Sequence, residues 1–216
     1  MERAFEAPTV MNISGDVIAR DVSYEDFLNR YDGEHVEWID GVVITMSPVT
    51  PDNNRISGFA SRLLATYLEL AGGGEVFTDP VVMRLPNQHR GRAPDIQVVL
   101  PANTHLVQGQ EIAGPADLVV EVISPGSQHR DRVEKFAEYE RAGVKEYWIL
   151  DPTRHETLFY VLNAQGLYEL QEPDEHGVYH SVVLDHLTIP AGIFWRDPLP
   201  NTVEILQMVQ FMLGQG

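Results

Sequence analysis

Three short runs of strand-forming residues, each next to residues that favour turns, place the strongest constraint on how this chain can fold. They read PDIQVVL (94–100), LVVEVIS (118–124) and VKEYWIL (144–150). Continuous runs of Val, Ile and Leu, unlike alternating ones, indicate strands that are covered on both faces of a sheet. The chain is therefore expected to bury these strands beneath other structure.

In the first two of these runs, a carboxylate stands where an apolar residue is expected. Asp95 lies at the start of the first run and Glu121 lies inside the second. Burying an unpaired, ionised carboxylate costs several kcal/mol even after its surroundings relax. Each acid therefore needs a hydrogen-bonding partner, a raised pKa or a metal ion, and the two together mark a candidate site.

Length and composition predict one globular domain. The chain has 216 residues and no polar linker that would divide it, so we expect an N-terminal arm over residues 1–21 and a single domain over residues 22–216. No apolar run of membrane-spanning length and no signal-peptide pattern occurs, which predicts a cytoplasmic protein with no membrane partner. Because the chain has no cysteine, disulfides and thiolate zinc sites are excluded, and a metal would need oxygen or nitrogen ligands.

The net charge of −17 argues against a protein that coats nucleic acid with its whole surface. The charge is unevenly distributed, because residues 84–135 hold equal numbers of basic and acidic side chains. The basic ones are Arg84, Arg90, Arg92, Arg130, Arg132 and Lys135, and the acidic ones are Asp95, Glu111, Asp117, Glu121, Asp131 and Glu134. All of the acidic excess lies outside this segment, so a local cationic site on an acidic body is possible.

The other elements follow from periodicity and turn signals. Residues 52–71 have the apolar spacing of a helix that ends at Gly72–Gly74, and Asp40-Gly41 predicts a hairpin turn. The chain from Leu85 to Arg92 is expected to be a loop. Further predicted elements are helices at 23–31, from Ser127 or Asp131 to Ala142, and at 201–213, and antiparallel strands at 155–162, 167–172 and 179–184.

The acids can converge if the first two apolar runs are neighbouring strands. Side chains alternate between faces along a strand, so Asp95 and Gln97 share a face. Mg²⁺ prefers a few carboxylates together with waters and a substrate phosphate, and Glu37 is the candidate third acid. Lys135 is the nearest lysine downstream, and it could orient or help to deprotonate an attacking water.

Each of these residues also has an ordinary structural explanation. Asp95 could be a turn acid at a strand entry, Glu121 could pair with Arg92 or Arg130, and Glu37 could be a solvated strand residue. Lys135 could simply pair with Asp131 one helical turn earlier. The spacing of His176 and His180 matches a helical zinc pair, but Gly177 and the strand-type surroundings make a helix there improbable.

Several motifs in order resemble the Uma-two family of restriction-endonuclease-like proteins, which belongs to the PD-(D/E)XK nuclease superfamily. They are HVEWIDGVVITMSP, APDIQVVL and GPADLVVEVISPGSQHRDRVEKFAEYERAGVKEYWILDP. The resemblance runs from about residue 22 to the C-terminus. It implies an α/β fold with a restriction-endonuclease-like core, in which helices flank a central mixed β-sheet, and extra antiparallel strands follow.

The resemblance also assigns roles to the acids. Asp95 matches the acid of the PD motif, Glu121 matches the second acid, and Glu37 matches the acid from the N-terminal part. The superfamily lysine usually stands two residues after the second acid, where this chain has Ile123. The resemblance therefore points to Lys135 as a migrated lysine, which a long and flexible side chain makes feasible.

By the same resemblance, Asp95, Glu121 and the main-chain carbonyl of Val122 would bind the metal, and Glu37 could join them. Substrate contacts would come from Gln97, Arg130 and Arg132. The implied function is a Mg²⁺-dependent endonuclease, with Mn²⁺ as a substitute, that hydrolyses phosphodiester bonds of DNA. The alternative is a non-catalytic interaction or regulatory protein that keeps the nuclease fold. Superfamily habit and the apolar segment VEILQMVQFML (203–213) also suggest a homodimer.

Overall fold

The apolar runs form the middle of a six-stranded mixed sheet in the computed structural model, which describes residues 15–214. The strand order is β13-β12-β11-β10-β7-β4, with β10 and β11 parallel and all other neighbours antiparallel. The strands are β4 (Glu75–Thr78), β7 (Ile96–Val99), β10 (Leu118–Val122), β11 (Glu146–Asp151), β12 (Glu156–Leu162) and β13 (Tyr168–Gln171). Both β7 and β10 are buried along their whole length, as continuous apolar runs predict.

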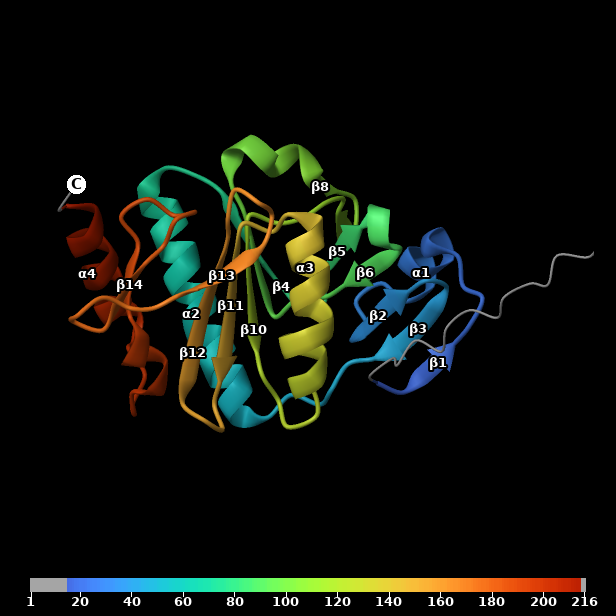
Figure 1. Cartoon of the computed structure of the whole chain (residues 1–216), viewed down its shortest axis with the longest axis horizontal. Coiled ribbons are helices and arrows are strands. Elements are labelled where there is room, and N and C mark those ends of the chain that lie inside the picture. Colours follow the sequence, from blue (N-terminus) through green and yellow to red (C-terminus); the bar gives the residue numbers. More distant parts are fainter. Residues whose placement is uncertain (1–14, 215–216) are drawn as a thin grey trace, which may run out of the picture.

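Helices cover both faces of this sheet (Figure 1). One face carries side chains such as Ile96, Val98 and Val120, which pack against α2 (Pro51–Ala71) and α4 (Thr202–Leu213). The other face carries Val119 and Ile123, which pack in the cluster that includes α3 (Phe136–Ala142). Alternation therefore places Asp95 and Glu121 on the α3 side of the sheet.

The boundaries of the two long helices agree with those predicted from the sequence. Thr50 caps the N-terminus of α2 by accepting the Asn53 amide proton, and Gly72 ends the helix with a positive φ of 99°. Asn201 forms a capping box with Glu204 at the start of α4. None of the helices described over residues 15–214 is long and apolar enough to cross a lipid bilayer.

A second sheet carries Glu37 towards the first. Its order is β1-β3-β2-β6-β5-β9-β8, and β2 and β3 form the predicted hairpin, with positive φ angles at Asp40 and Gly41. The strands are β1 (Val17–Ala19), β2 (Val36–Ile39), β3 (Val42–Thr45), β5 (Val82–Leu85), β6 (Arg90–Arg92), β8 (Val107–Gln108) and β9 (Glu111–Ile112). The helix α1 (Tyr24–Arg30) starts at its predicted cap, Ser23, and packs Phe27 into the cluster beside this sheet.

Three local predictions are wrong. Residues 17–19, assigned to an N-terminal arm, pair with β3 as strand β1, while residues 1–14 lie outside the described residues. The predicted loop before Arg92 contains strand β6, which the sequence RGR does not reveal because it lacks strand-forming residues. Only part of the strand expected at 179–184 forms, as β14 (Val178–His180), and it pairs with β15 (Thr188–Pro190) in a separate sheet.

Three short 3₁₀ helices connect other elements: η1 (Pro86–Gln88), η2 (Pro101–Leu106) and η4 (Ala191–Trp195). The helix expected from Ser127 or Asp131 is helical from residue 128, but its first part, η3 (Arg130–Lys135), has the wider turn of a π-helix. Such turns are often found at functional sites. Here the π-helical turn carries Asp131 and Lys135 beneath the acids of the sheet.

Candidate active site

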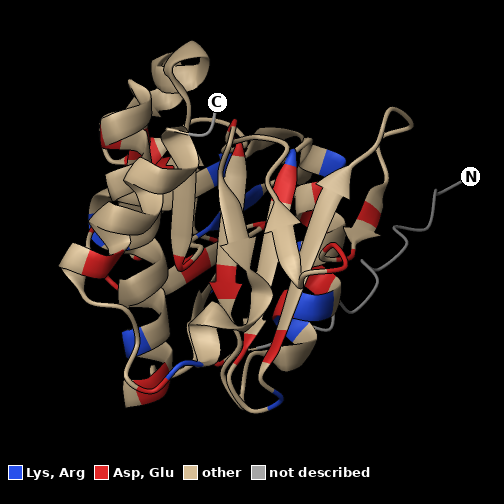
Figure 2. Cartoon of the chain, turned by 90° about the vertical axis from the view of Figure 1, so that its left-hand side faces the viewer, with Lys and Arg blue, Asp and Glu red and all other residues tan. Residues whose placement is uncertain are grey.

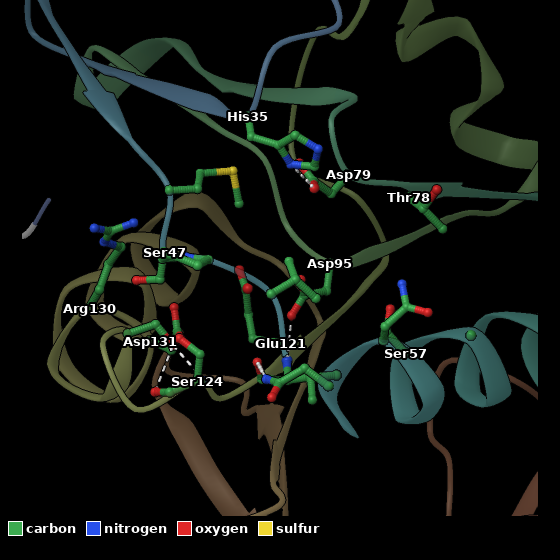
Figure 3. A pocket seen from close by; sticks show the side chains of 18 of the residues that line it. His35, Ser47, Ser57, Thr78, Asp79, Asp95, Glu121, Ser124, Arg130 and Asp131 are labelled. Atoms are coloured by element: carbon green, nitrogen blue, oxygen red, sulfur yellow. Dashed lines mark hydrogen bonds and ion pairs between the residues drawn. The ribbon is translucent and has the colours of Figure 1, made fainter. Parts of the chain in front are cut away.

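Asp95 and Glu121 lie side by side because β7 and β10 are antiparallel neighbours. The register pairs Gln97 with Val119 and Ile96 with Val120, and one further step brings Asp95 opposite Glu121. The carboxylate of Asp95 accepts a hydrogen bond of 2.6 Å from the main-chain N–H of Val122. Figure 3 shows both acids facing the same pocket.

Lys135 reaches these acids from the π-helical turn. Its Nζ lies 2.7 Å from Glu121 Oε1, 3.0 Å from Glu37 Oε1 and 3.7 Å from Asp131 Oδ1. The lysine is 2% exposed. The Tyr139 hydroxyl also donates to Glu121 Oε1, at 2.9 Å, and holds that carboxylate in place. We call Asp95, Glu121, Asp131 and Lys135 the cavity cluster.

Glu37 joins this cluster to a second buried group of charges. Arg92 Nη1 donates to Glu37 Oε2 at 2.7 Å, and Arg92 Nε donates to Glu138 Oε2 at the same distance. Arg90 Nε donates to Glu138 Oε1 at 2.8 Å. We call Glu37, Arg90, Arg92 and Glu138 the Arg92 cluster. It fixes Glu37 between the second sheet and α3, so Glu37 is fully buried and is not the solvated strand residue of the alternative explanation.

The electrostatics of the two clusters differ. Burial raises the pKa of Asp95 to about 7, because the Val122 hydrogen bond and the charge of Lys135 offset only part of the desolvation. Burial likewise raises the pKa of Glu121 well above its usual value. Burial would also raise the pKa of Glu37, but Lys135, Arg92 and Arg130 outweigh it and lower that pKa to about 2.

The ammonium of Lys135 is held in its charged form. Burial acts to lower its pKa, but the negative charges of Glu121, Glu37 and Asp131 prevail and raise that pKa above its usual value. The pKa of Asp131 is itself raised by burial, against the opposing effect of Lys135. One fixed cation therefore faces several carboxylates whose ionisation is disfavoured.

A cavity of about 500 Å³ opens onto the cavity cluster. Its floor is acidic, with Asp95, Glu121 and Asp131, whereas the wall formed by α2 is neutral. That wall presents Asn53, Asn54, Ser57, Gly58 and Ser61. At the rim, His35 Nδ1 lies 2.6 Å from Asp79 Oδ2, and Figure 3 shows this pair above Asp95.

Comparisons with known proteins give a family and a similar fold for the chain. The family model Uma2, described as "Putative restriction endonuclease", matches residues 23–191. The chain belongs to this family. A solved structure of a putative nuclease belonging to DUF820, from Anabaena variabilis ATCC 29413, is similar in fold, with a TM-score of 0.61 and 16% sequence identity. The similarity covers 87% of this chain and 99% of that one. The comparison with curated proteins gives no match.

The family match confirms the resemblance read from the sequence motifs, and the structural match confirms the α/β fold with a nuclease-like core. Within this Uma2 chain, the structure brings together all four residues that the sequence singled out. Lys135 is in direct contact with both Glu121 and Glu37, and Asp95 lies beside Glu121. Their chemical roles stay predictions.

Two predicted substrate contacts lie away from the cavity. Gln97 is fully buried and donates to the carbonyl of Val81 at 2.7 Å, so it braces the segment before β5. Arg132 lies 2.7 Å from Asp151 and 2.6 Å from Glu156, on the far side of the π-helical turn. Neither residue lines the cavity, whereas Arg130 does. Within the π-helical turn, Arg130 and Arg132 therefore point in different directions, and the sequence does not reveal this difference.

Other cavity residues were missed as site residues by the sequence reasoning. Asp131 was considered only as a pairing partner of Lys135. Its position one helical turn before Lys135 was nevertheless the sequence signal that could have placed it in the site. Asn53 donates from Nδ2 to the carbonyls of Val122 and Ile123, at 3.0 Å each, and fastens the end of β10 to α2. The His35–Asp79 pair forms only through tertiary contacts, so no local pattern could reveal it.

The donor set fits a hard divalent cation in its chemistry. Within residues 15–214, no three His, Asp or Glu side chains are already arranged around one metal position, and the Lys135 ammonium contacts two of the acids. Asp95 and Glu121 nevertheless offer adjacent carboxylates in an open cavity with an excess of acid, which suits an ion that takes few protein ligands. The Val122 carbonyl already accepts the Asn53 hydrogen bond and keeps a second lone pair.

Proposed function

We propose that this Uma2-family protein is an endonuclease that hydrolyses phosphodiester bonds of DNA and requires a divalent cation, Mg²⁺ with Mn²⁺ as a substitute. The observation that carries the proposal is the pairing of Asp95 and Glu121 in an open cavity with the Lys135 ammonium beside them. Burial disfavours the charge on both acids. A cation at this position would restore their ionised forms.

Asp95 and Glu121 would hold the cation, with the Val122 carbonyl as a main-chain ligand and Glu37 as a possible addition. When bound, a divalent cation offsets negative charge on a phosphate and lowers the pKa of water. The chain's own residues orient the reactants. Because Lys135 is a cation pinned by Glu37 and Glu121, it donates hydrogen bonds to the attacking water or to a phosphate oxygen, rather than accepting a proton.

The wall and rim of the cavity would position the substrate. Arg130 lines the cavity and can neutralise a phosphate oxygen, and Ser57 and Ser61 can donate hydrogen bonds from α2. Asn53 holds the end of β10 against α2, so the acids and the neutral wall keep one relative position. Preorganisation of this kind supports a positioning role in phosphodiester hydrolysis.

Plasmid nicking tests the proposal. Supercoiled DNA and single-stranded DNA are incubated with the full chain and Mg²⁺ or Mn²⁺, and Asp95→Asn and Lys135→Ala are compared with it. We expect cation-dependent nicking that falls at least about a hundredfold in both variants, the size of effect seen when one group that stabilises transition-state charge is removed. Asp117→Asn is the matched control, because Asp117 is also a buried acid at a strand end, paired with Lys145 outside the cavity.

The results separate the assumptions. Nicking lost in Asp95→Asn but kept in Lys135→Ala would leave the acids in the mechanism and remove the lysine. If Asp117→Asn lost nicking activity to the same extent, the losses in the other variants would reflect general destabilisation of the protein. An absence of nicking on both substrates would contradict the nuclease proposal.

The alternative is a non-catalytic interaction or regulatory protein. The observation that favours it is the Lys135 ammonium, which occupies the space between Glu121 and Glu37 and closes an ion-pair network without any metal. The net charge of −17, which repels nucleic acid, points the same way. Affinity of the parent chain for Mn²⁺ that Asp95→Asn abolishes favours the nuclease, and no affinity at all favours the alternative.

We also propose a homodimer formed through α4. Two apolar side chains of this helix are highly exposed, Val203 at 63% and Phe211 at 68%. Symmetric dimers are the commonest oligomers, and such exposed residues suit an interface. Light scattering of the parent and of Phe211→Ser tests this, with a dimer expected for the parent and a monomer for the variant. A monomeric parent would contradict it.

A further inference from the structure

A second cavity adjoins the candidate active site on the other side of α2. It has a volume of about 760 Å³ and lies between the N-terminal half of α2 and residues 194–201. Three arginines line it, Arg55 and Arg62 from α2 and Arg196 from the segment that follows η4. We call this cavity the arginine groove.

The arginine groove and the cavity with the acids adjoin along α2. Asn54 and Gly58 of α2 line both of them. A Cβ placed on Gly58 would lie 3.5 Å from Nη1 of Arg62, so this guanidinium lies beside the glycine at their shared boundary.

The arginines of the groove are available to a ligand. Arg55 and Arg196 are 66% and 52% exposed, and among residues 15–214 each forms an ion pair with one exposed carboxylate, Asp52 and Glu204 respectively. Arg62 is exposed and forms no ion pair with a carboxylate within residues 15–214. Exposed ion pairs contribute at most about 1 kcal/mol, so a phosphate can replace them at little cost.

Positive charge in this region is unusual for the molecule. The chain carries 15 basic residues against 32 acidic ones, and Figure 2 shows acidic segments spread over the helices and strands of the side that faces the viewer. Between the acidic cavity floor and the arginines, the α2 wall has only neutral residues such as Ser57 and Ser61. A polyanion that enters the cavity therefore meets less repulsion along this path than elsewhere.

We propose that the arginine groove binds the phosphodiester backbone of the nucleic-acid substrate on one side of the bond that is cleaved. The inference rests on the proposed nuclease function. Guanidinium groups bind phosphate oxygens in a fork geometry, and several such groups along a groove position a strand without reading its sequence. The groove lets an acidic protein hold DNA, because its three arginines outnumber its two aspartates, Asp52 and Asp197, next to the site of cleavage.

Binding and cleavage are tested together on the full chain. Fluorescence polarisation with labelled single-stranded and duplex oligonucleotides, in EDTA so that no cleavage occurs, compares the parent with Arg55→Ala, Arg62→Ala, Arg196→Ala and the triple variant. Arg30→Ala is the matched control. Arg30 has a similar exposure, 65%, and pairs with an exposed aspartate, Asp26, but both residues belong to α1 and lie outside the groove. Each assay is repeated over a series of salt concentrations.

We expect each groove substitution to weaken binding about threefold to tenfold and the triple substitution about a hundredfold. The slope of log affinity against log salt should fall by about 0.7 to 0.9 for each phosphate that the groove no longer neutralises. Arg30→Ala should bind like the parent. In nicking assays, the triple variant should raise KM while kcat at saturating DNA stays within about twofold.

The outcomes separate this inference from the proposed function. If the parent nicks DNA but the triple variant matches Arg30→Ala in affinity, salt slope and KM, the groove inference is overturned and the nuclease stands. If the triple variant loses kcat but not affinity, the groove does not bind the strand and the inference is equally overturned. If the parent neither binds nor nicks DNA, both fail.

Discussion

The two buried charge clusters that meet at Glu37 differ in their balance of charge. In the Arg92 cluster, two carboxylates face two arginines, and the pKa values of Glu37 and Glu138 are lowered although burial opposes this. In the cavity cluster, three carboxylates share one ammonium, and burial raises the pKa of every one of them. The Arg92 cluster is complete as it stands, whereas the cavity cluster lacks positive charge.

This difference shows how a functional site can be told from a structural ion-pair network. Burial alone does not distinguish them, because Arg92 and Lys135 are both almost fully buried. Access and charge balance do distinguish them, because the residues of the cavity cluster line the 500 Å³ cavity and those of the Arg92 cluster do not. A balanced network fixes the position of Glu37, and the unbalanced one retains capacity for a cation.

The largest expected effect comes from breaking the balanced cluster. Arg92→Leu leaves Glu37 and Glu138 without their main partner in the protein interior. We expect a loss of about 4 kcal/mol in the free energy of unfolding, measured by urea denaturation, because a broken buried pair leaves an uncompensated charge. Arg154→Ala, which removes an exposed partner of Asp151, is the control and should change little. A loss below about 1 kcal/mol for Arg92→Leu would contradict the structural role.

A somewhat smaller effect is expected at the centre of the cavity cluster. Lys135→Met removes the ammonium and should cost about 3 kcal/mol in the absence of divalent cations. Mn²⁺ should bind Lys135→Met more tightly than the parent, in which the ammonium competes for the same carboxylates. At saturating Mn²⁺, each tenfold difference in dissociation constant stabilises the variant by about 1.4 kcal/mol relative to the parent. The stability gap to the parent should therefore narrow with Mn²⁺, whereas the gap for Arg92→Leu should not. Equal behaviour of the two variants would erase the distinction between the clusters.

A pH-dependent effect is expected for Glu138. Its folded-state pKa is lowered, since Arg92 and Arg90 overcome the desolvation of burial. Its contribution to stability is thus present above the usual value of 4.5 and is lost as the pH falls through the lowered folded value. Glu138→Gln should be about 2 kcal/mol less stable than the parent at pH 7, with a gap that shrinks below pH 4.5. A gap that is constant from pH 3 to pH 7 would contradict this sign.

The smallest effect is expected for the glutamate-to-glutamine substitution in the cavity cluster, Glu121→Gln. Glu121→Gln replaces a carboxylate whose ionised form is disfavoured by burial with a neutral isostere. Without divalent cations, we expect its free energy of unfolding to stay within about 1 kcal/mol of the parent value. Chemical denaturation in EDTA measures it beside Glu138→Gln. A loss as large as that of Glu138→Gln would mean that Glu121 belongs to a balanced network.

Much of the site could be predicted from sequence because carboxylates in apolar strands are locally anomalous. Asp95 and Glu121 stood out for that reason, and the condition for their convergence, that their strands are neighbours, is met because β7 pairs with β10. Glu146 shows the limit of this reasoning. It is also a buried acid in an apolar strand, but its oxygens accept from Ser181, Trp148 and the main-chain N–H groups of Val182 and Val183.

The remaining features depend on contacts that are distant in sequence. The pairing of Arg92 with Glu37 and Glu138 joins three elements, and no spacing rule reveals it. The direction of Arg132 follows from the π-helical turn and from Asp151 at the end of β11. Strand β6 places Gly91 against Tyr24 and Phe27, where a Cβ would lie 2.9 Å from the Tyr24 ring, and this is a packing constraint that the sequence RGR does not reveal.

Calorimetric titration with Mn²⁺ tests the central claim, that the cavity cluster lacks positive charge and binds a divalent cation. The parent, Asp95→Asn and Glu138→Gln are titrated under the same conditions. The account predicts saturable binding to the parent and to Glu138→Gln, and its loss in Asp95→Asn. Absence of binding to the parent, or binding that Asp95→Asn leaves unchanged, would contradict it.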